Sequence, residues 1–235
     1  ALAYGQAIGI YLAFVVDKMA DYNSALCSWR TADGNIRSTF GRQAIPMVWT
    51  FAEGNPFSAV SGNFKAMLDS VAESVERLGF GVPAAVSQGN ALTVEYPQGA
   101  LVCTELPYYR DIDYADLSDF FYIWLRRSLK GTCPQMFLPL MTPKDELSTV
   151  STYSGVSRED AEESYRAGIG TVCEKLYACS SREYPAMLFY CFRRNDLACI
   201  QHGGAKRNQS AWELMLESLL SAGFSITAVW PMRSE

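Results

Sequence analysis

Six consecutive residues near the middle of the chain carry the groups best suited to chemistry. Thr104-Glu105-Leu106-Pro107-Tyr108-Tyr109 follows the apolar run from Gly99 to Cys103, so an acid, a proline and aromatic side chains come directly after a predicted strand. A carboxylate and a backbone carbonyl can accept hydrogen bonds from an amino group, which favours the tetrahedral nitrogen that attacks a methyl group. Proline fixes φ and stiffens the turn that aims such a carbonyl. An aromatic side chain can stack on a nucleobase that has left its helix.

The segment from Thr104 to Leu129 resembles the corresponding part of the adenine-specific DNA methylase family. Members of that family usually read Asp-Pro-Pro-Tyr-Tyr where this chain has Glu105-Leu106-Pro107-Tyr108-Tyr109. Two other segments, 41–57 and 230–235, look like the same family in the same order. The resemblance implies S-adenosylmethionine-dependent methylation of DNA at N6 of adenine or N4 of cytosine, with base flipping and no covalent enzyme intermediate.

The resemblance also implies roles for individual residues. Glu105 stands where the family's acid accepts a hydrogen bond from the target amine, and the backbone of Leu106 or Pro107 would supply the second acceptor. Leu106 takes the place of the first proline, and Pro107 matches the second. Tyr108 matches the stacking aromatic, and the DNA contacts would fall on the next two residues, Tyr109 and Arg110.

Two further residues are predicted beside the methyl donor. Thr104 precedes the motif directly, and Asn90 follows a predicted strand at a position where the family can place a polar residue against the cofactor adenine. A plain turn is the alternative for Asn90, because Gln88-Gly89-Asn90 has turn composition. Lys206 and Arg207 belong to the most basic stretch and could contact phosphates, with a solvated loop as the alternative.

A glycine-rich cofactor turn of the type Asp-Pro-Phe-x-Gly-x-Gly, which the family would carry, does not occur in the sequence. Such a turn lets backbone amides approach the cofactor. We therefore expect the chain to be the carboxyl-terminal portion of a methylase, inactive alone, with the upstream half or a second copy of the chain as partner. The alternative is a catalytically inactive, methylase-derived domain with a binding or assembly role, and a weaker option is amino methylation of RNA or protein.

Composition excludes several other classes. A net charge of -5 argues against binding DNA by bulk electrostatics. His202 is the only histidine, which argues against a histidine triad or a multi-histidine metal site. Seven cysteines without a C-x-x-C pair indicate a reducing, cytoplasmic setting. The apolar run from Ile8 to Val16 is too short to span a bilayer, for which about 20 residues are needed. Asp113, Asp116 and Asp119 are interpreted as acids at a helix start rather than as metal ligands.

Alternating helices and strands predict an α/β fold with a mostly parallel sheet. The resemblance implies that this is a partial Rossmann-like class I methyltransferase sheet with flanking helices. We expect a helical segment at 1–81 and the methyltransferase-like domain at 82–235, with an irregular insertion at about 132–155. The predicted helices cover about 3–29, 40–53, 64–78, 117–130, 157–176 and 210–223. Tyr165 falls on the apolar face of the fifth helix, Ser210 with Glu213 suits a capping box at the start of the sixth, and Gly223 suits its end. Asp33-Gly34-Asn35 is a predicted turn. The predicted strands cover 83–87, 100–104, 186–192 and 225–230.

Overall fold

The structure is a computed structural model of the chain. It describes residues 1–42, 44–79, 81–107, 114–147, 158–191, 200–202 and 205–232, with the backbone alone at 158–159, 200–202 and 205–209. Contacts within the chain define two compact units, one of Ala1–Ala85 with Tyr114–Lys144 and one of Val86–Asp113 with Asp145–Glu235. The predicted division into 1–81 and 82–235 stays a prediction. It has a boundary near that of the first unit but places residues 114–144 in its second part.

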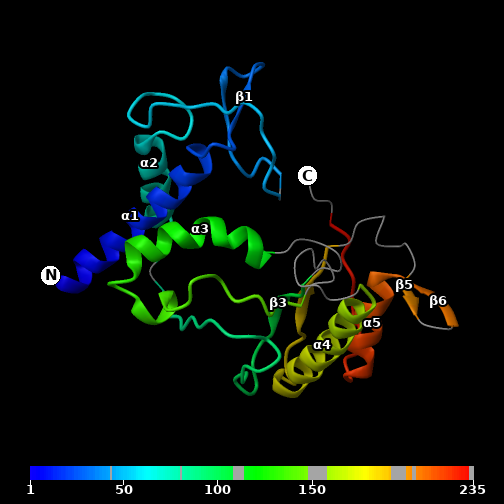
Figure 1. Cartoon of the computed structure of the whole chain (residues 1–235). Coiled ribbons are helices and arrows are strands. Elements are labelled where there is room, and N and C mark those ends of the chain that lie inside the picture. The colour runs from blue at the N-terminus through cyan, green and yellow to red at the C-terminus, as the bar shows by residue number, and fades with distance from the viewer. Residues whose placement is uncertain are drawn as a thin grey trace. The chain divides into compact units, whose positions relative to one another are not determined.

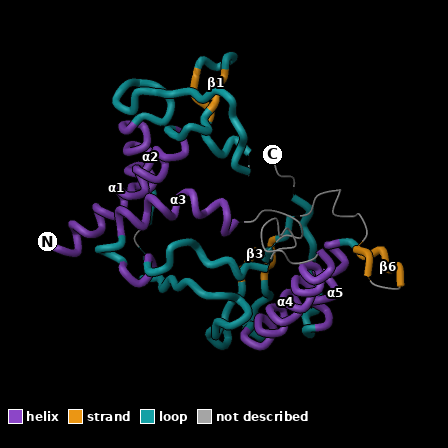
Figure 2. The backbone as a smooth tube through the Cα atoms, viewed as in Figure 1, coloured by secondary structure: helices purple, strands orange, loops and turns teal. Residues whose placement is uncertain are grey.

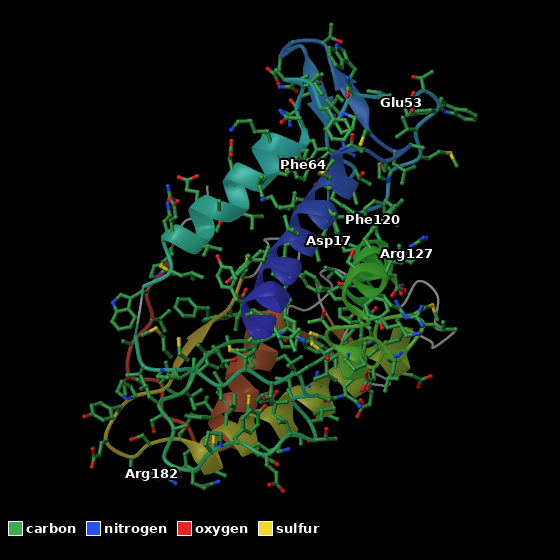
Figure 3. The ribbon with its side chains drawn as sticks, turned by 90° about the vertical axis from the view of Figure 1, so that its left-hand side faces the viewer. Asp17, Glu53, Phe64, Phe120, Arg127 and Arg182 are labelled. Carbon is green, nitrogen blue, oxygen red and sulfur yellow. The ribbon has the colours of Figure 1, made fainter. Side chains whose placement is uncertain are left out.

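Three helices form the frame of the first unit (Figure 1). Helix α1 (Leu2–Tyr22) contacts both α2 (Phe64–Glu76) and α3 (Tyr114–Leu129). Figure 3 labels Asp17 on α1, Phe64 at the start of α2 and Phe120 on α3. Asn63 caps α2 by accepting a hydrogen bond from the amide of Ala66 at 2.9 Å. The predicted helices at 64–78 and 117–130 are thus confirmed, with small differences at their ends.

The chain after α1 forms a hairpin instead of continuing the helix. The expected helix over 3–29 ends at Tyr22, and the carbonyl of Asp21 in its last turn accepts a hydrogen bond from the amide of Thr39 at 2.7 Å. Strands β1 (Ser28–Arg30) and β2 (Asn35–Arg37) then pair antiparallel. The predicted turn between them is confirmed, and Gly34 has φ 61°, which glycine adopts at little cost.

The predicted helix over 40–53 is wrong: the described residues of that stretch are not helical. Pro46 restricts the residue before it, Ile45, to extended conformations, so a helix cannot pass through this point easily. The amide of Ala52 instead donates to the carbonyl of Cys27 at 3.0 Å. This tertiary hydrogen bond holds the end of the stretch beside the hairpin.

A β-α-β arrangement organises the second unit (Figure 2). Strand β3 (Cys103–Glu105) leads, through residues that include helix α4 (Arg158–Cys179), to strand β4 (Met187–Phe189). The two strands pair in parallel, with Thr104 opposite Leu188, and an isolated parallel bridge joins Ala100 to Ser180. Parallel strands need such a crossover because a tight turn cannot connect them.

Helix α5 (Ala211–Ser221) packs beside α4 and completes the core of the second unit (Figure 1). Ser210 and Glu213 form the predicted capping box, and Gly223 with φ 104° follows the helix end as predicted. Strands β5 (Ile200–His202) and β6 (Ala205–Gln209) pair antiparallel. The core residues are Val102 and Leu106 beside β3, Tyr165, Ile169, Val172, Cys173, Leu176 and Cys179 of α4, and Ala211, Leu214, Met215 and Leu219 of α5.

The fold class is α/β, as predicted, and the finer Rossmann-like sheet stays a prediction. The described residues contain five α-helices and three two-stranded sheets, one of them parallel. Residues 83–87 and 225–230 form no strand, so these two predictions are wrong. Val86 is 95% exposed and Trp230 is 77% exposed, which means that neither segment is covered by a neighbour. The described part of the predicted insertion, 132–147, contains only the 3-10 helix η1 (Pro134–Phe137).

Candidate functional site at the carboxyl end of strand β3

The predicted catalytic residues stand at the end of a strand whose side chains alternate between core and solvent. Val102 and Leu106 are buried, and Thr104 between them is half-buried. Cys103, Glu105 and Pro107 are exposed. This period of two is that of a strand with one covered face, and it directs the Glu105 carboxylate to the uncovered face.

Leu106 is a core residue in this structure. Its side chain is only 4% exposed and belongs to the cluster that contains Tyr165 and Ile169 of α4. A proline here would give up part of that apolar contact. The leucine that departs from the family pattern therefore has a packing role at the point where the strand ends.

Tyr165 of α4 holds the residue that follows Leu106. Its hydroxyl donates a hydrogen bond to the carbonyl oxygen of Pro107 at 2.5 Å, and its side chain is 3% exposed. Its place on the apolar face of a predicted helix did not mark Tyr165 as a residue of the site. Helical spacing predicted its burial, but no local signal connects a tyrosine to a proline 58 positions away.

Phe189 is a second residue that the sequence analysis missed. It lies opposite Glu105 in the parallel pairing of β3 and β4, and its side chain is 41% exposed. Directly paired residues of neighbouring strands present their side chains on the same face of a sheet. An aromatic ring therefore stands beside the carboxylate at the same edge.

A pocket of about 330 Å³ adjoins this strand end. All four described residues of the motif, Thr104 to Pro107, line it. Val172 and Leu176 of α4 and Ala91 and Tyr96 from the preceding segment complete much of its wall. Small-molecule sites commonly have volumes of about 300–1,000 Å³, with mostly apolar walls and a few polar groups. The pocket has this character.

Asn90 organises the turn beside the pocket. Its side-chain oxygen accepts from the amide of Leu92 at 2.9 Å, and its amide nitrogen donates to Asp145 at 2.9 Å. Lys175 of α4 donates to the carbonyl of Leu92 at 2.8 Å and ties the turn to the helix. The next residue, Ala91, lines the pocket. Asn90 thus acts in a turn, which was the alternative considered, and its contact with a cofactor stays a prediction.

Burial changes the acidity of two groups near the pocket. The pKa of Tyr96 is raised by burial and, to a smaller extent, by the charge of Cys179. Burial, with a smaller effect of Glu174, raises the pKa of the Cys173 thiol to about 11. A thiol with so high a pKa stays protonated at neutral pH and is a poor nucleophile. Cys173 is therefore a packing residue rather than a reactive one.

The remaining predicted site residues are not all described. Tyr108, Tyr109 and Arg110 lie outside the described residues, so the structure does not test their roles. Lys206 and Arg207 lie in β6, of which the backbone alone is described. Their contact with phosphates stays a prediction.

Two of the three acids predicted at the start of α3, Asp116 and Asp119, have a structural partner, whereas Asp113 lies outside the described residues. Lys144 lies 2.8 Å from a carboxylate oxygen of Asp116 and 2.6 Å from one of Asp119. Burial raises the pKa of Asp119, but the hydrogen bonds from Lys144 and Thr142 together outweigh it and leave the pKa below its ordinary value. Within the described ranges, no group of three or more His, Cys, Asp or Glu residues could hold a metal ion.

Comparisons with known proteins identify no relative of this chain. No protein-family model, no curated protein and no solved structure matches it.

No helix in the described part of the chain has both the length and the apolar character needed to cross a membrane.

Proposed function

We propose that this chain carries the amine-binding edge of a DNA methyltransferase that acts on N6 of adenine or N4 of cytosine and uses S-adenosylmethionine. One observation carries the proposal. Thr104, Glu105, Leu106 and Pro107, at the carboxyl end of a parallel strand, all line the same pocket. In open α/β sheets, ligands bind outside the carboxyl ends of the strands.

The chemistry of the acceptor side follows from three groups. The Glu105 carboxylate accepts one hydrogen bond from the exocyclic amine. The Pro107 carbonyl is already engaged by Tyr165, so we assign the second acceptor to the main-chain carbonyl of Leu106. When both amino protons donate hydrogen bonds to these acceptors, the tetrahedral nitrogen that attacks a methyl group is favoured. Tyr108, and Phe189 beside Glu105, would supply stacking surfaces for the flipped base.

The pocket suits the methyl donor in its chemistry. S-adenosylmethionine, when bound, would supply an electrophilic methyl group. The apolar side chains of Ala91, Val172 and Leu176 suit an adenine ring, and Thr104 offers a hydroxyl to the ligand. The sequence contains no glycine-rich cofactor turn, so binding rather than turnover is the appropriate measurement for this chain.

Calorimetric titration with S-adenosylmethionine and its demethylated product tests the donor part of the proposal. We expect saturable one-to-one binding of both compounds. Ala91 is exposed and lines the pocket, so Ala91→Trp should fill it and weaken binding at least tenfold, whereas the matched Ala91→Ser should not. No measurable binding, or equal binding by both variants, would contradict a donor site in this pocket.

A binding or assembly role without methyl transfer is the second candidate, and the burial of Leu106 favours it. A leucine held in the core replaces the proline that the family places in its catalytic turn. An assembly domain has no reason to distinguish an adenine amine from its dimethylated form, which has no N–H groups to donate. Discrimination between these two bases therefore separates the two candidates.

A further inference from the structure

We infer that Tyr165 is the positioning residue of the turn that presents Glu105 and the Leu106 carbonyl to the target amine. The inference rests on the proposed function and assigns a role to a residue outside the motif. Tyr165 acts through Pro107, whose carbonyl oxygen accepts a hydrogen bond from its hydroxyl at 2.5 Å. A hydroxyl-to-oxygen distance of this size is at the short end of the usual range.

The tyrosine itself is held firmly by its helix. Its side chain is 3% exposed and packs in the cluster that contains Ile169, one turn further along α4, and Leu106. A buried ring in a close-packed core keeps one orientation. The position of the hydroxyl, and with it the Pro107 carbonyl, is therefore set by α4.

Two anchors then flank one peptide unit. The Leu106 side chain is fixed in the core before the Leu106–Pro107 peptide, and the Pro107 carbonyl is fixed by Tyr165 after it. The family pattern places two consecutive prolines here, which restrict φ at both positions. Leu106 lacks that restriction. The two tertiary anchors replace it and hold the Leu106 carbonyl, the assigned acceptor, in one direction.

The chain offers a matched control for this hydrogen bond. Tyr122 of α3 also donates its hydroxyl to a proline carbonyl, that of Pro139, at 2.8 Å. Tyr122 and Pro139 belong to the other unit. Tyr165→Phe and Tyr122→Phe each remove one hydroxyl that donates to a proline carbonyl, so both should lower the urea midpoint of unfolding modestly.

The test is binding of two single-stranded DNA oligonucleotides, measured by fluorescence anisotropy on the whole chain. One contains a single adenine in a run of thymines, and the other has N6,N6-dimethyladenine at that position. Removing the two N–H donors leaves a carboxylate without its partner, so the wild type should prefer adenine by about tenfold. Tyr165→Phe should reduce this preference below about threefold, whereas Tyr122→Phe should keep it. If Tyr165 had a purely structural role, Tyr165→Phe would weaken the binding of both oligonucleotides by the same factor.

A second variant keeps the test decisive if Tyr165→Phe folds poorly. Replacement of Tyr165 by 4-aminophenylalanine retains the ring and a donor at its para position, and it should restore the preference for adenine. If the wild type prefers adenine and Tyr165→Phe retains the full preference, the inference is wrong and the proposed function stands. If the wild type shows no preference, the proposed function fails and the inference falls with it.

Discussion

Glu105 lies opposite Phe189 in the parallel pairing of β3 with β4, and both side chains are exposed. An acceptor of hydrogen bonds and a flat apolar surface thus stand side by side on two neighbouring strands. A nucleobase needs both kinds of contact, since its amino group donates hydrogen bonds and its ring stacks. The strand pairing, rather than a loop, fixes the separation of these two groups.

Phe189→Ala should weaken binding of single-stranded DNA without unfolding the protein. Stacking of one base on an aromatic side chain contributes roughly 1–3 kcal/mol, so we expect an affinity loss of about fivefold or more. Phe51→Ala is the matched control, because Phe51 is 52% exposed and belongs to the other unit. Anisotropy titrations of both variants check this prediction. Equal affinities of the two variants for single-stranded DNA would show that Phe189 is not part of the site.

Leu106→Ala should destabilise the second unit strongly. Deletion of a buried leucine side chain costs about 2–5 kcal/mol of unfolding free energy, because the apolar contacts are lost and a cavity remains. Leu101→Ala is the control in the same segment, since Leu101 is 65% exposed, and its effect should stay within about 0.5 kcal/mol. Urea unfolding at neutral pH measures both. Similar losses in the two variants would contradict the core position of Leu106.

Asp17 should make the stability of the first unit depend on pH. Burial raises the pKa of this aspartate from 3.8 to about 6, and one of its carboxylate oxygens is buried without a hydrogen-bond partner among the described residues. The folded state therefore binds the proton more tightly than the unfolded state between about pH 4 and pH 6, so stability falls as the pH rises through this window.

Exposure to solvent limits the size of this pH-dependent change in the free energy of unfolding. The shift alone would correspond to about 3 kcal/mol, and the partial exposure of the side chain reduces this to on the order of 1 kcal/mol. Asp17→Asn, which cannot ionise, should match the wild type near pH 4 and exceed its stability by that amount at pH 7. Urea unfolding at both values tests this, and a constant difference between the two proteins would refute it.

Lys144→Met should destabilise the protein more than a typical loss of a surface ion pair. Lys144 contacts two carboxylates, Asp116 and Asp119, and also donates to the carbonyl of Ala115 at 2.9 Å. We expect a loss of about 1 kcal/mol for this network and less than about 0.5 kcal/mol for Lys65→Met, whose partner Asp69 lies four residues along an exposed helix face. Equal unfolding free energies of the two variants at pH 7 would contradict the network.

Capping residues in the sequence were sufficient to predict the helix whose ends they form. Both ends of α5 were predicted, the start from Ser210 and Glu213 and the end from Gly223, because capping depends on neighbours within one helical turn. The helix expected over 40–53 failed for the opposite reason. Its apolar residues suggested helical burial, but Pro46 and a hydrogen bond from Ala52 to Cys27 across the hairpin decided the conformation.

The same distinction applies to the site. The position of Glu105 at a strand end followed from the apolar run before it, whereas the burial of Leu106 was not predicted. Phe189 lies beside the motif only because β4 pairs with β3. Tyr165 reaches the motif only through a hydrogen bond to a residue 58 positions away. Contacts of that range depend on the packing of α4 on the strands, which no local pattern encodes.

The most direct test of the account is whether Glu105 recognises an exocyclic amine. Oligonucleotides with adenine or N6,N6-dimethyladenine are titrated against the wild type, Glu105→Ala and the control Glu95→Ala, which removes the same charge from another exposed glutamate. The account predicts that the wild type and Glu95→Ala prefer adenine by about tenfold and that Glu105→Ala has no preference. A preference that survives in Glu105→Ala, or that the wild type lacks, would contradict it.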